Sequence, residues 1–483
     1  MVIDALKYQI LQQFGFVPTE EQGQALDAFA RFLTDRDPHA VMILRGSAGT
    51  GKTSLSGAIV RTLKAIRQKV MLLAPTGRAA KVFSLNSGYP AYTIHRRIYR
   101  EKSFAGVDGQ FNLNGNLFTD TLFMVDEASM ISNLGLGGGN FGSGCLLDDL
   151  VRFVYQGHND RLMLIGDKAQ LPPVGEEESP ALNRMMLEGY GLKVYECDLN
   201  EVLRQSQESG ILYNATVIRQ MITHDDITQL PLIRFKGFAD IVMMPGNELV
   251  ESLANSYYRV GQDETMVITR SNKRANIYNN GIRNMVLDRE EELSCGDMLM
   301  IVKNNYFWTE KERNEAKEAL NAIPPFLANG DRAKVLRVSR HMELYGFRFA
   351  TLLLQFPDYD NYEMSVTALL DTLQSEAPAL THEQQEQLFH GVEEDYQDVP
   401  LKADRMKAIR GDQYFNALQV KYAYAITCHK AQGGQWEHVY VDQGYMTDDM
   451  LTPDYIHWLY TAFTRAKGKL FLVNWPKTQT EQA

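Results

Sequence analysis

A glycine-rich segment has the residue types and spacing that hold phosphate groups. It fits the pattern G-x-x-x-x-G-K-[ST], and its residues are Gly46, Ser47, Ala48, Gly49, Thr50, Gly51, Lys52 and Thr53. It follows an apolar run, 41–44, and opens a stretch with helical periodicity, 53–67. In that setting backbone N–H groups approach the β-phosphate, Lys52 reaches the β and γ oxygens, and the Thr53 hydroxyl binds Mg²⁺. The segment therefore predicts a P-loop for a nucleoside triphosphate.

An apolar run that ends in two acids supplies groups for metal binding and hydrolysis. Asp126 and Glu127 directly follow the run 122–125. A carboxylate at the carboxyl end of a strand can hold Mg²⁺, so we expect Asp126 and Thr53 to bind the metal. Glu127 is then placed to orient or deprotonate an attacking water. Strands often end in acidic turns, but the P-loop in the same domain favours a hydrolytic site.

Seven short apolar runs must form the strands that position these groups. Many of their residues are β-branched, and each run ends in a polar or glycine-rich turn, as buried parallel strands do. The runs are 41–44, 70–73, 122–125, 162–165, 266–268, 439–441 and 470–473. Helix-period segments lie between several of them, which indicates parallel sheets with helical crossovers. Because the pattern occurs in two blocks, about 38–220 and 240–480, we expect two α/β domains.

Two insertions are expected in these blocks. Residues 99–119 are rich in Gly and Asn, which favours a β-hairpin, and 331–415 combines two antiparallel strands with an acidic, helix-like stretch at 357–412. A Gly-rich loop at 133–144 matches no motif. The predicted division is 1–98 and 120–220 for the first domain, 99–119 for its hairpin, 221–330 and 416–483 for the second domain, and 331–415 for a small inserted β domain.

Composition excludes several classes of protein. The 483 residues are 45% hydrophobic and 23% charged, which is ordinary globular usage. The four cysteines lie far apart with no CxxC pair, which argues against a disulfide scaffold or a zinc knuckle. No signal-peptide pattern is present, and no apolar run approaches the ~18 residues of a membrane span. These features predict a soluble cytoplasmic protein without a membrane partner.

Charge is distributed unevenly along the chain. The net charge of −11 argues against a generally basic nucleic-acid binder. However, residues 38–100 and 265–287 contain Lys and Arg but no Asp or Glu, whereas 349–401 is acidic and has no Lys or Arg. A charged run is often only a solvated face. Two basic segments beside motifs instead favour local phosphate binding, whatever the total charge.

Residues 162–174, LMLIGDKAQLPPV, resemble motif III of the superfamily 1 helicases, in particular the RecD-like 5′→3′ branch called superfamily 1B. Other stretches resemble further motifs of that family, in order along nearly the whole chain. They are 19–22 (Q motif), 74–81 (motif Ia), 93–95 (the motif that follows it), 202–205 (motif IV), 422–433 (motif V) and 460–467 (motif VI). The resemblance implies an α/β fold with two RecA-like domains. It also implies that the hairpin is a separation pin and that the 331–415 insertion is an SH3-like barrel.

The resemblance also implies that ATP, with Mg²⁺, binds between the two domains. Gln22 would read the adenine, Gly433 would join the nucleotide site, and Gln170 would sense the γ-phosphate. Arg204 and Arg465 would point at the γ-phosphate, with Arg465 supplied by the second domain, because a guanidinium holds phosphate oxygens bidentately. A surface ion pair is the alternative for each arginine, and a simple turn amide is the alternative for Gln170.

A strand-binding surface is implied by the same motifs. Hydroxyl, amide and basic side chains at strand ends suit phosphate contacts that carry no sequence information. The implied residues are Pro75, Thr76, Arg78, Thr93 and His95 in the first domain, and Asn272, Arg274, Thr427, His429 and Lys430 in the second. His95 and His429 could instead be packed core residues. Aromatic candidates for stacking on bases are Tyr99, Phe104, Phe111, Tyr306, Phe307 and Trp308, although most aromatic residues belong to cores.

Together these features predict an ATP-dependent DNA helicase that moves 5′→3′ on single-stranded DNA and unwinds duplex. The expected partners are single-stranded and forked DNA, the expected state is a monomer, and the acidic stretch 357–412 offers a surface for a protein partner. Two alternatives stay open, an RNA helicase of the same superfamily and a non-motor DNA-dependent ATPase that acts as a scaffold. The sequence shows no nuclease-like carboxylate cluster.

Overall fold

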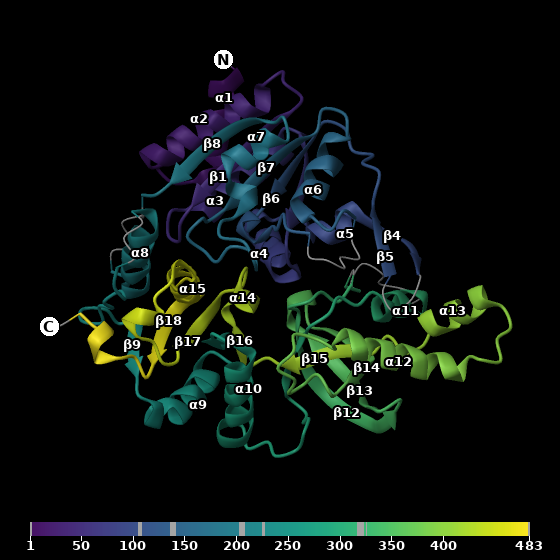
Figure 1. Ribbon diagram of the computed structural model, residues 1–483. Helices are drawn as coiled ribbons and strands as arrows, with labels where there is room; N and C mark the ends of the chain where they lie inside the picture. Colours follow the sequence, from purple (N-terminus) through teal and green to yellow (C-terminus); the bar gives the residue numbers. More distant parts are fainter. Residues whose placement is uncertain are drawn as a thin grey trace.

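The computed structural model describes residues 2–104, 109–135, 142–201, 208–224, 228–315, 323–324 and 326–481. Figure 1 shows three bodies, with the first α/β domain at the top, the second at the lower left and a β-barrel with its helices at the lower right. The fold class predicted from the sequence is confirmed, because two parallel sheets, a hairpin and a closed barrel are all present.

The first sheet has six strands in the order β3-β2-β6-β7-β1-β8, and every neighbouring pair is parallel. Strands β1, β6 and β7 are buried at every position, as expected for central strands covered on both faces. The bounds are β1 Ala40–Gly46, β2 Lys69–Ala74, β3 Ala91–Thr93, β6 Thr121–Val125, β7 Arg161–Gly166 and β8 Lys193–Leu199.

Helices cover both faces of this sheet. Because side chains alternate along a strand, Met42 and Leu44 of β1 pack with α1, α2 and α3, whereas Val41 and Ile43 pack with α6. Helix α2 begins with a capping box, in which the Thr19 hydroxyl accepts from the N–H of residue 22. The helices are α1 Val2–Phe14, α2 Glu20–Thr34, α3 Lys52–Ala65, α4 Gly77–Ser87, α5 Ile94–Ile98, α6 Leu146–Tyr155 and α7 Arg184–Gly189.

The second sheet has five parallel strands in the order β16-β10-β17-β18-β9. Its strands are β9 Ile241–Met244, β10 Thr265–Thr269, β16 Ala425–Thr427, β17 Trp436–Asp442 and β18 Ala466–Val473. Its helices are α8 Gly210–Thr223, α9 Leu249–Arg259, α10 Asn272–Gly281, α14 Cys428–Ala431 and α15 Pro453–Phe463. All seven apolar runs lie in strands of the two sheets, so those strand predictions are confirmed.

Helix α8 belongs physically to the second domain. Its buried residues Ile211, Ala215 and Ile218 join the core of the second sheet, and α8 packs against α15. The boundary predicted between residues 220 and 221 therefore falls inside a helix of the second domain. Apolar periodicity identifies a helix, but it does not say which of two sheets the helix covers.

A closed barrel of five strands, β11-β12-β13-β14-β15, is inserted in the second domain. Its strands are β11 Met298–Ile301, β12 Arg332–Leu344, β13 Phe347–Phe356, β14 Tyr362–Leu369 and β15 Leu418–Tyr422. Strands β11 and β15 lie outside the predicted range 331–415, because closing the barrel requires partners for both edges of the three central strands. The stretch 357–412 is helical only in its later part, since β14 lies within it.

The predicted hairpin is formed by the antiparallel strands β4 Tyr99–Phe104 and β5 Gly109–Leu113. Figure 1 shows it at the edge of the first domain that faces the barrel and its helices. The helices of the insertion are α11 Phe307–Glu315, α12 His382–Asp395 and α13 Lys402–Arg410. Short 3₁₀ or π turns occupy Ala128–Met130, Pro180–Leu182, Gly246–Glu248, Ile282–Val286, Pro357–Tyr359, Asp448–Met450 and Lys477–Gln479.

Candidate nucleotide site and nucleic-acid interface

The P-loop lies where strand β1 turns into helix α3. Gly46 ends β1, and Gly51 directly precedes the first helical residue, Lys52. Gly51 has a φ of 76°, a left-handed conformation that glycine adopts at little cost. Lys52 Nζ donates a 2.9 Å hydrogen bond to Gly46 O, while Thr53 is exposed on the first turn of α3. The loop therefore offers an ammonium group beside a helix N-terminus, which is an arrangement that binds anions.

Asp126 and Glu127 lie directly after β6. The N–H of Asp126 donates to Leu73 O at 3.0 Å, and the N–H of Glu127 donates to Asp126 Oδ1 at 2.9 Å. Burial, reinforced by the charge of Glu127, raises the pKa of Asp126 to about 6, and the positive charge of Lys52 opposes the shift. The structure therefore brings together the two acids and the P-loop lysine predicted from the sequence.

Two buried oxygen atoms near this cluster fit the predicted ligand. In the described part of the chain, Glu127 Oε2 and Gln170 Oε1 have no hydrogen-bond partner. Buried polar atoms are normally paired, so such atoms call for a ligand, a water or an ion. Sequence reasoning assigns these two side chains to the attacking water and the γ-phosphate. The residues present therefore fit a site for a hydrated triphosphate and Mg²⁺.

The loop after β7 connects this cluster to the second domain. Asp167 accepts a 2.9 Å hydrogen bond from the N–H of Ala169 and a 2.6 Å hydrogen bond from the hydroxyl of Tyr460, on helix α15. The Tyr460 hydroxyl also accepts from the N–H of Ala48 in the P-loop at 3.0 Å. One side chain of the second domain thus contacts both the P-loop and the loop after β7.

Further contacts from the second domain hold the same loop. The N–H of Leu171 donates to Thr461 Oγ1 at 2.8 Å, and Gln432 Nε2 donates to Leu171 O at 2.7 Å. A ring nitrogen of His457 lies 2.9 Å from Ala169 O. Helix α15 and the segment after α14 therefore hold the loop that follows β7 by hydrogen bonds. A movement of the second domain would change the position of this loop.

The predicted arginines are placed differently from one another. Arg465 is buried and donates to Thr461 O at 3.0 Å, to Gly434 O at 3.2 Å and to Thr464 Oγ1 at 3.1 Å, all within the second domain. Arg204 lies outside the described residues. The γ-phosphate contacts assigned to both arginines therefore stay predictions.

Gln22 and Gly433, which the sequence assigned to the nucleotide site, both contact residues of the first domain. Gln22 Nε2 donates to Thr50 O in the P-loop at 2.9 Å, while its side-chain oxygen accepts from the N–H of Thr19. Gly433, with a φ of 72°, lies against Ala79 of helix α4, and an added Cβ would come within 2.9 Å of the Ala79 Cβ. Gln22 thus abuts the P-loop, whereas Gly433 marks a close contact between domains.

Sequence reasoning missed three residues at this contact between the domains, namely Asp167, Arg219 and Tyr460. Asp167 and Tyr460 belong to motif-like stretches already identified, but the stretches alone do not show that the two residues meet. Arg219, on α8, hydrogen-bonds to Ser47 Oγ of the P-loop and lies 3.4 Å from Asn200 O. No local pattern marked it, because its importance depends on which domain carries α8.

The predicted strand-binding residues of the first domain lie at the starts of two helices. The hydroxyls of Thr76 and Thr93 cap α4 and α5, accepting N–H bonds at 3.2 and 3.4 Å, and Thr93 is buried. Pro75, beside Thr76, is half-buried. His95 packs against Tyr99, and burial lowers the pKa of its imidazole to about 4. His95 is therefore neutral at neutral pH and does not provide a cation for phosphate.

The second-domain candidates differ in how free their side chains are. Arg274 is paired with Asp442 at 2.7 Å, and Asn272 Nδ2 donates to Glu376 O at 3.2 Å. His429 is exposed, and Thr427 precedes helix α14 without a side-chain capping bond. Lys430 Nζ is buried and has no hydrogen-bond partner among the described residues. Lys430 is thus the clearest unpaired cation of this set.

The acidic stretch 357–412 lies against several of these residues. Asp358 is 3.6 Å from Arg78 and 3.7 Å from Lys81, and Lys81 Nζ also donates to Pro357 O at 2.9 Å. Arg78 donates to Gln435 O at 3.1 Å as well. In this arrangement a carboxylate of the insertion lies beside both Arg78 and Lys81.

The aromatic candidates are mostly core residues where they can be assessed. Tyr99 is buried, and its hydroxyl donates to Asp149 at 2.7 Å. Trp308 is buried and donates to Asn416 O at 2.9 Å, while Tyr306 stacks on Phe326 with ring centroids 4.9 Å apart. The side chains of Phe104 and Phe111 lie outside the described residues, as does the middle of the Gly-rich loop 133–144.

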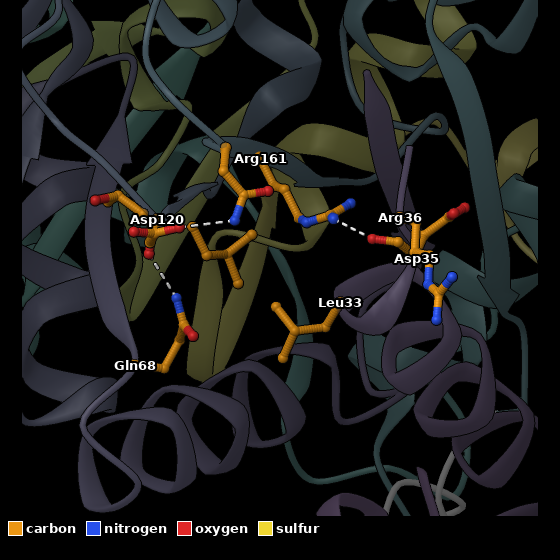
Figure 2. Close-up of a pocket in the computed structure, with 9 residues that line it drawn as sticks. Leu33, Asp35, Arg36, Gln68, Asp120 and Arg161 are labelled. Atoms are coloured by element: carbon orange, nitrogen blue, oxygen red, sulfur yellow. Dashed lines mark hydrogen bonds between the residues drawn. The ribbon is translucent and has the colours of Figure 1, made fainter. Parts of the chain in front are cut away.

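A separate pocket of about 560 Å³ lies at the opposite edge of the first sheet. Its lining includes Gln68, Thr121 and Arg161, at or beside the amino ends of β2, β6 and β7, whereas the P-loop stands at a carboxyl end. Figure 2 shows Gln68 and Arg161 facing this pocket with Asp120. Arg161 donates to the carbonyls of residues 32, 35 and 37, so its guanidinium fixes the end of α2. None of the predicted site residues lines it.

Two family matches cover separate parts of the chain. Residues 19–228 match the family described as AAA domain, and residues 422–473 match the UvrD-like helicase C-terminal domain. A further match is the ATP-dependent RecD2 DNA helicase of Deinococcus radiodurans, 31% identical over 156 residues. In these parts the chain is therefore similar to helicase domains, the RecD2 helicase among them. The matches cover the P-loop domain and the helix α15 region, two parts that contact each other.

Other proteins resemble this chain over different lengths. An uncharacterized protein of Methanocaldococcus jannaschii is 32% identical over 170 residues, which are 33% of this chain and 14% of that protein. The RecD2 match covers 32% of this chain and 18% of that protein, so the chain spans less than a fifth of either relative. The Pif1 helicase from Bacteroides, in a crystal structure with ADP-AlF3 and single-stranded DNA, superposes over 97% of this chain and 95% of that chain, with 13% identity and a TM-score of 0.47.

The described residues include no helix that is both long enough and apolar enough to cross a membrane.

Proposed function

We propose that this chain is an ATP-dependent DNA helicase, which translocates 5′→3′ on single-stranded DNA and unwinds duplex DNA. The observation that carries the proposal is the double contact of Tyr460 with Ala48 and Asp167, which links the P-loop of one domain to a helix of the other. A motor needs such a link, because nucleotide-dependent closure must be transmitted between the domains that hold the strand.

The residues of the first domain have assigned roles in hydrolysis. The P-loop amides and Lys52 bind the phosphates of ATP, and Thr53 with Asp126 holds Mg²⁺, which supplies charge neutralisation at the phosphates. Glu127 orients the attacking water and accepts its proton, and Gln170 contacts the γ-phosphate. Arg465 and Arg204 are proposed to add positive charge at the γ-phosphate. Two orphaned oxygens, Glu127 Oε2 and Gln170 Oε1, support this assignment.

The strand is proposed to run across both domains on the side of α4 and α14. Thr76, Arg78 and Thr93 bind phosphates on the first domain, and Thr427, His429 and Lys430 bind them on the second. Lys430 supports this track best, since its ammonium group is buried without a hydrogen-bond partner among the described residues. We also propose that the hairpin β4–β5 meets the duplex at a fork, and that the protein works as a cytoplasmic monomer.

A protein partner is proposed for the acidic insertion. Helix α12 carries Glu383, Glu386, Glu393, Glu394 and Asp395, and no Lys or Arg lies within its bounds. A solvated acidic helix of this kind suits a basic partner surface.

Strand separation on tailed duplexes tests the proposed function. A duplex with a 5′ single-stranded tail should be unwound with ATP, and one with a 3′ tail should not, while Lys52→Ala serves as the inactive control. Unwinding of the 3′-tailed duplex alone would refute the polarity. ATP hydrolysis without unwinding of either duplex would favour the scaffold alternative. Stimulation of hydrolysis by poly(U) but not by poly(dT) would favour an RNA helicase.

A further inference from the structure

Arg219, which belongs to the second domain, contacts the P-loop. It lies in the C-terminal half of α8, the helix whose apolar face joins the core of the second sheet. Its guanidinium hydrogen-bonds to Ser47 Oγ and lies 3.4 Å from Asn200 O. The side chain therefore bridges the two domains, and its position depends on how they are arranged.

The guanidinium of Arg219 is not neutralised by a carboxylate. Among the residues that the structure describes, Arg219 forms no ion pair, whereas Arg45 is bound by Glu196 and Asp198 at 2.8 and 2.6 Å. Burial raises the pKa of Tyr460, and the positive charge of Arg219 opposes this shift. The guanidinium is therefore near the Tyr460 hydroxyl. A partly buried cation beside a phosphate-binding loop, with hydroxyl and carbonyl neighbours only, is suited to bind an anion.

The position of Ser47 indicates which phosphate Arg219 can reach. Lys52 Nζ, the group that contacts the β and γ oxygens in P-loops, is bonded to Gly46 O, and Ser47 follows Gly46 directly. Ser47 therefore lies at the terminal-phosphate end of the loop. A contact from this end distinguishes a triphosphate from a diphosphate.

We propose that Arg219 is a nucleotide-binding residue supplied by the second domain, and that it contacts the terminal phosphate of the nucleoside triphosphate held by the P-loop. The inference rests on the proposed function only in requiring that the P-loop binds ATP. The inference adds to the nucleotide site a cation that no motif assigned. It also means that the position of the second domain, which carries α8, responds to the presence of the terminal phosphate.

Equilibrium binding of nucleotides tests this role without relying on turnover. Fluorescent forms of a non-hydrolysable ATP analogue and of ADP are titrated into the full chain with Mg²⁺, for the wild type, Arg219→Gln and Arg219→Lys. Loss of a hydrogen bond to a charged group corresponds to roughly a 10- to 100-fold loss of affinity, which we expect for the ATP analogue with Arg219→Gln. The affinity for ADP should stay nearly unchanged, and Arg219→Lys should give an intermediate loss, because it keeps the charge without the planar fork.

Arg234→Gln is the matched control. Arg234 is also carried by the second domain, but its side chain faces Glu481 and the rings of Tyr213 and Phe238, away from the P-loop. It should bind both nucleotides like the wild type. An equal loss of affinity for the ATP analogue and ADP in Arg219→Gln, or no loss at all, would overturn the inference and leave Arg219 as a tether for α8.

The outcomes separate this inference from the proposed function. A selective loss of affinity for the ATP analogue supports the role of Arg219 even if the wild type unwinds no DNA. Conversely, unwinding by the wild type together with wild-type nucleotide affinities in Arg219→Gln keeps the helicase and removes Arg219 from the nucleotide site. Thermal unfolding of each variant shows whether a loss of affinity comes from a damaged fold.

Discussion

The hydroxyl of Tyr460 donates a 2.6 Å hydrogen bond to Asp167 Oδ2, across the boundary between the two α/β domains. The same hydroxyl accepts from the N–H of Ala48, so a single oxygen atom joins the P-loop, the loop after β7 and helix α15. Burial raises the pKa of both Asp167 and Tyr460. A buried hydrogen bond that involves a charged group is worth about 1.5–3 kcal/mol, which is enough to favour contact between the two domains.

Tyr460→Phe removes this oxygen and keeps the ring. We expect ATP binding to stay within a few-fold of wild type, and the stimulation of ATP hydrolysis by single-stranded DNA to fall by roughly tenfold, about the factor that the lost bond implies. The measurement is steady-state hydrolysis with and without poly(dT). Tyr455→Phe is the control, because that hydroxyl, on the same helix, bonds to Gln443 within the second domain. Equal stimulation in Tyr460→Phe and wild type would contradict the coupling role.

Arg465→Lys tests the second-domain arginine of motif VI. The three hydrogen bonds of Arg465 hold it in the second domain, and a lysine keeps one charge but cannot make all three. If Arg465 turns to the γ-phosphate during turnover, the rate should fall on the order of a hundredfold or more, with little change in ATP affinity. Single-turnover hydrolysis measures this rate. A drop in the melting temperature with an unchanged rate would instead assign Arg465 a packing role.

The fold was largely predictable, because its signals are local. Apolar runs such as 122–125 mark strands, and glycines such as Gly51 mark the P-loop turn, whatever the rest of the chain does. The assignment of α8 to the second domain, and with it the position of Arg219, depends on contacts between elements far apart in sequence. So do the neutral state of His95 and the approach of Asp358 to Arg78, since burial and ion pairing arise only in the packed structure.

Two lysines predict a pH dependence of strand binding. Burial lowers the pKa of Lys430 to about 8, and burial with the charge of Lys430 lowers the pKa of Lys421 to about 8. Both are mostly cationic at pH 7 and neutral at pH 9.5, so the affinity for single-stranded DNA should fall as the pH rises through 8. Fluorescence anisotropy at constant ionic strength measures it. Lys430→Gln should show a weaker dependence, and a flat profile in the wild type would remove Lys430 from the track.

The same lysines affect stability in the opposite direction. Their pKa values in the folded protein lie below the value of 10.5 for an unperturbed lysine. Between those values the unfolded chain binds more protons than the folded one, so the free energy of unfolding should rise as the pH increases from 8. Denaturant unfolding at pH 7.5 and 9.5 tests the sign. Lower affinity together with higher stability at pH 9.5 is the combined signature of buried cations.

Asp358→Asn tests whether the insertion competes with the strand. Asp358 lies 3.6 Å from Arg78 and 3.7 Å from Lys81, two basic groups on the helix proposed to bind phosphate. Removing its charge frees both groups for DNA, and the modest energy of a partly exposed ion pair corresponds to roughly a two- to fivefold gain in affinity. Asp360→Asn is the control, because Asp360 is exposed and pairs with neither group in the described structure. An equal gain in both variants would indicate a general charge effect, and a loss in Asp358→Asn would show that the contact holds the domains in their binding arrangement.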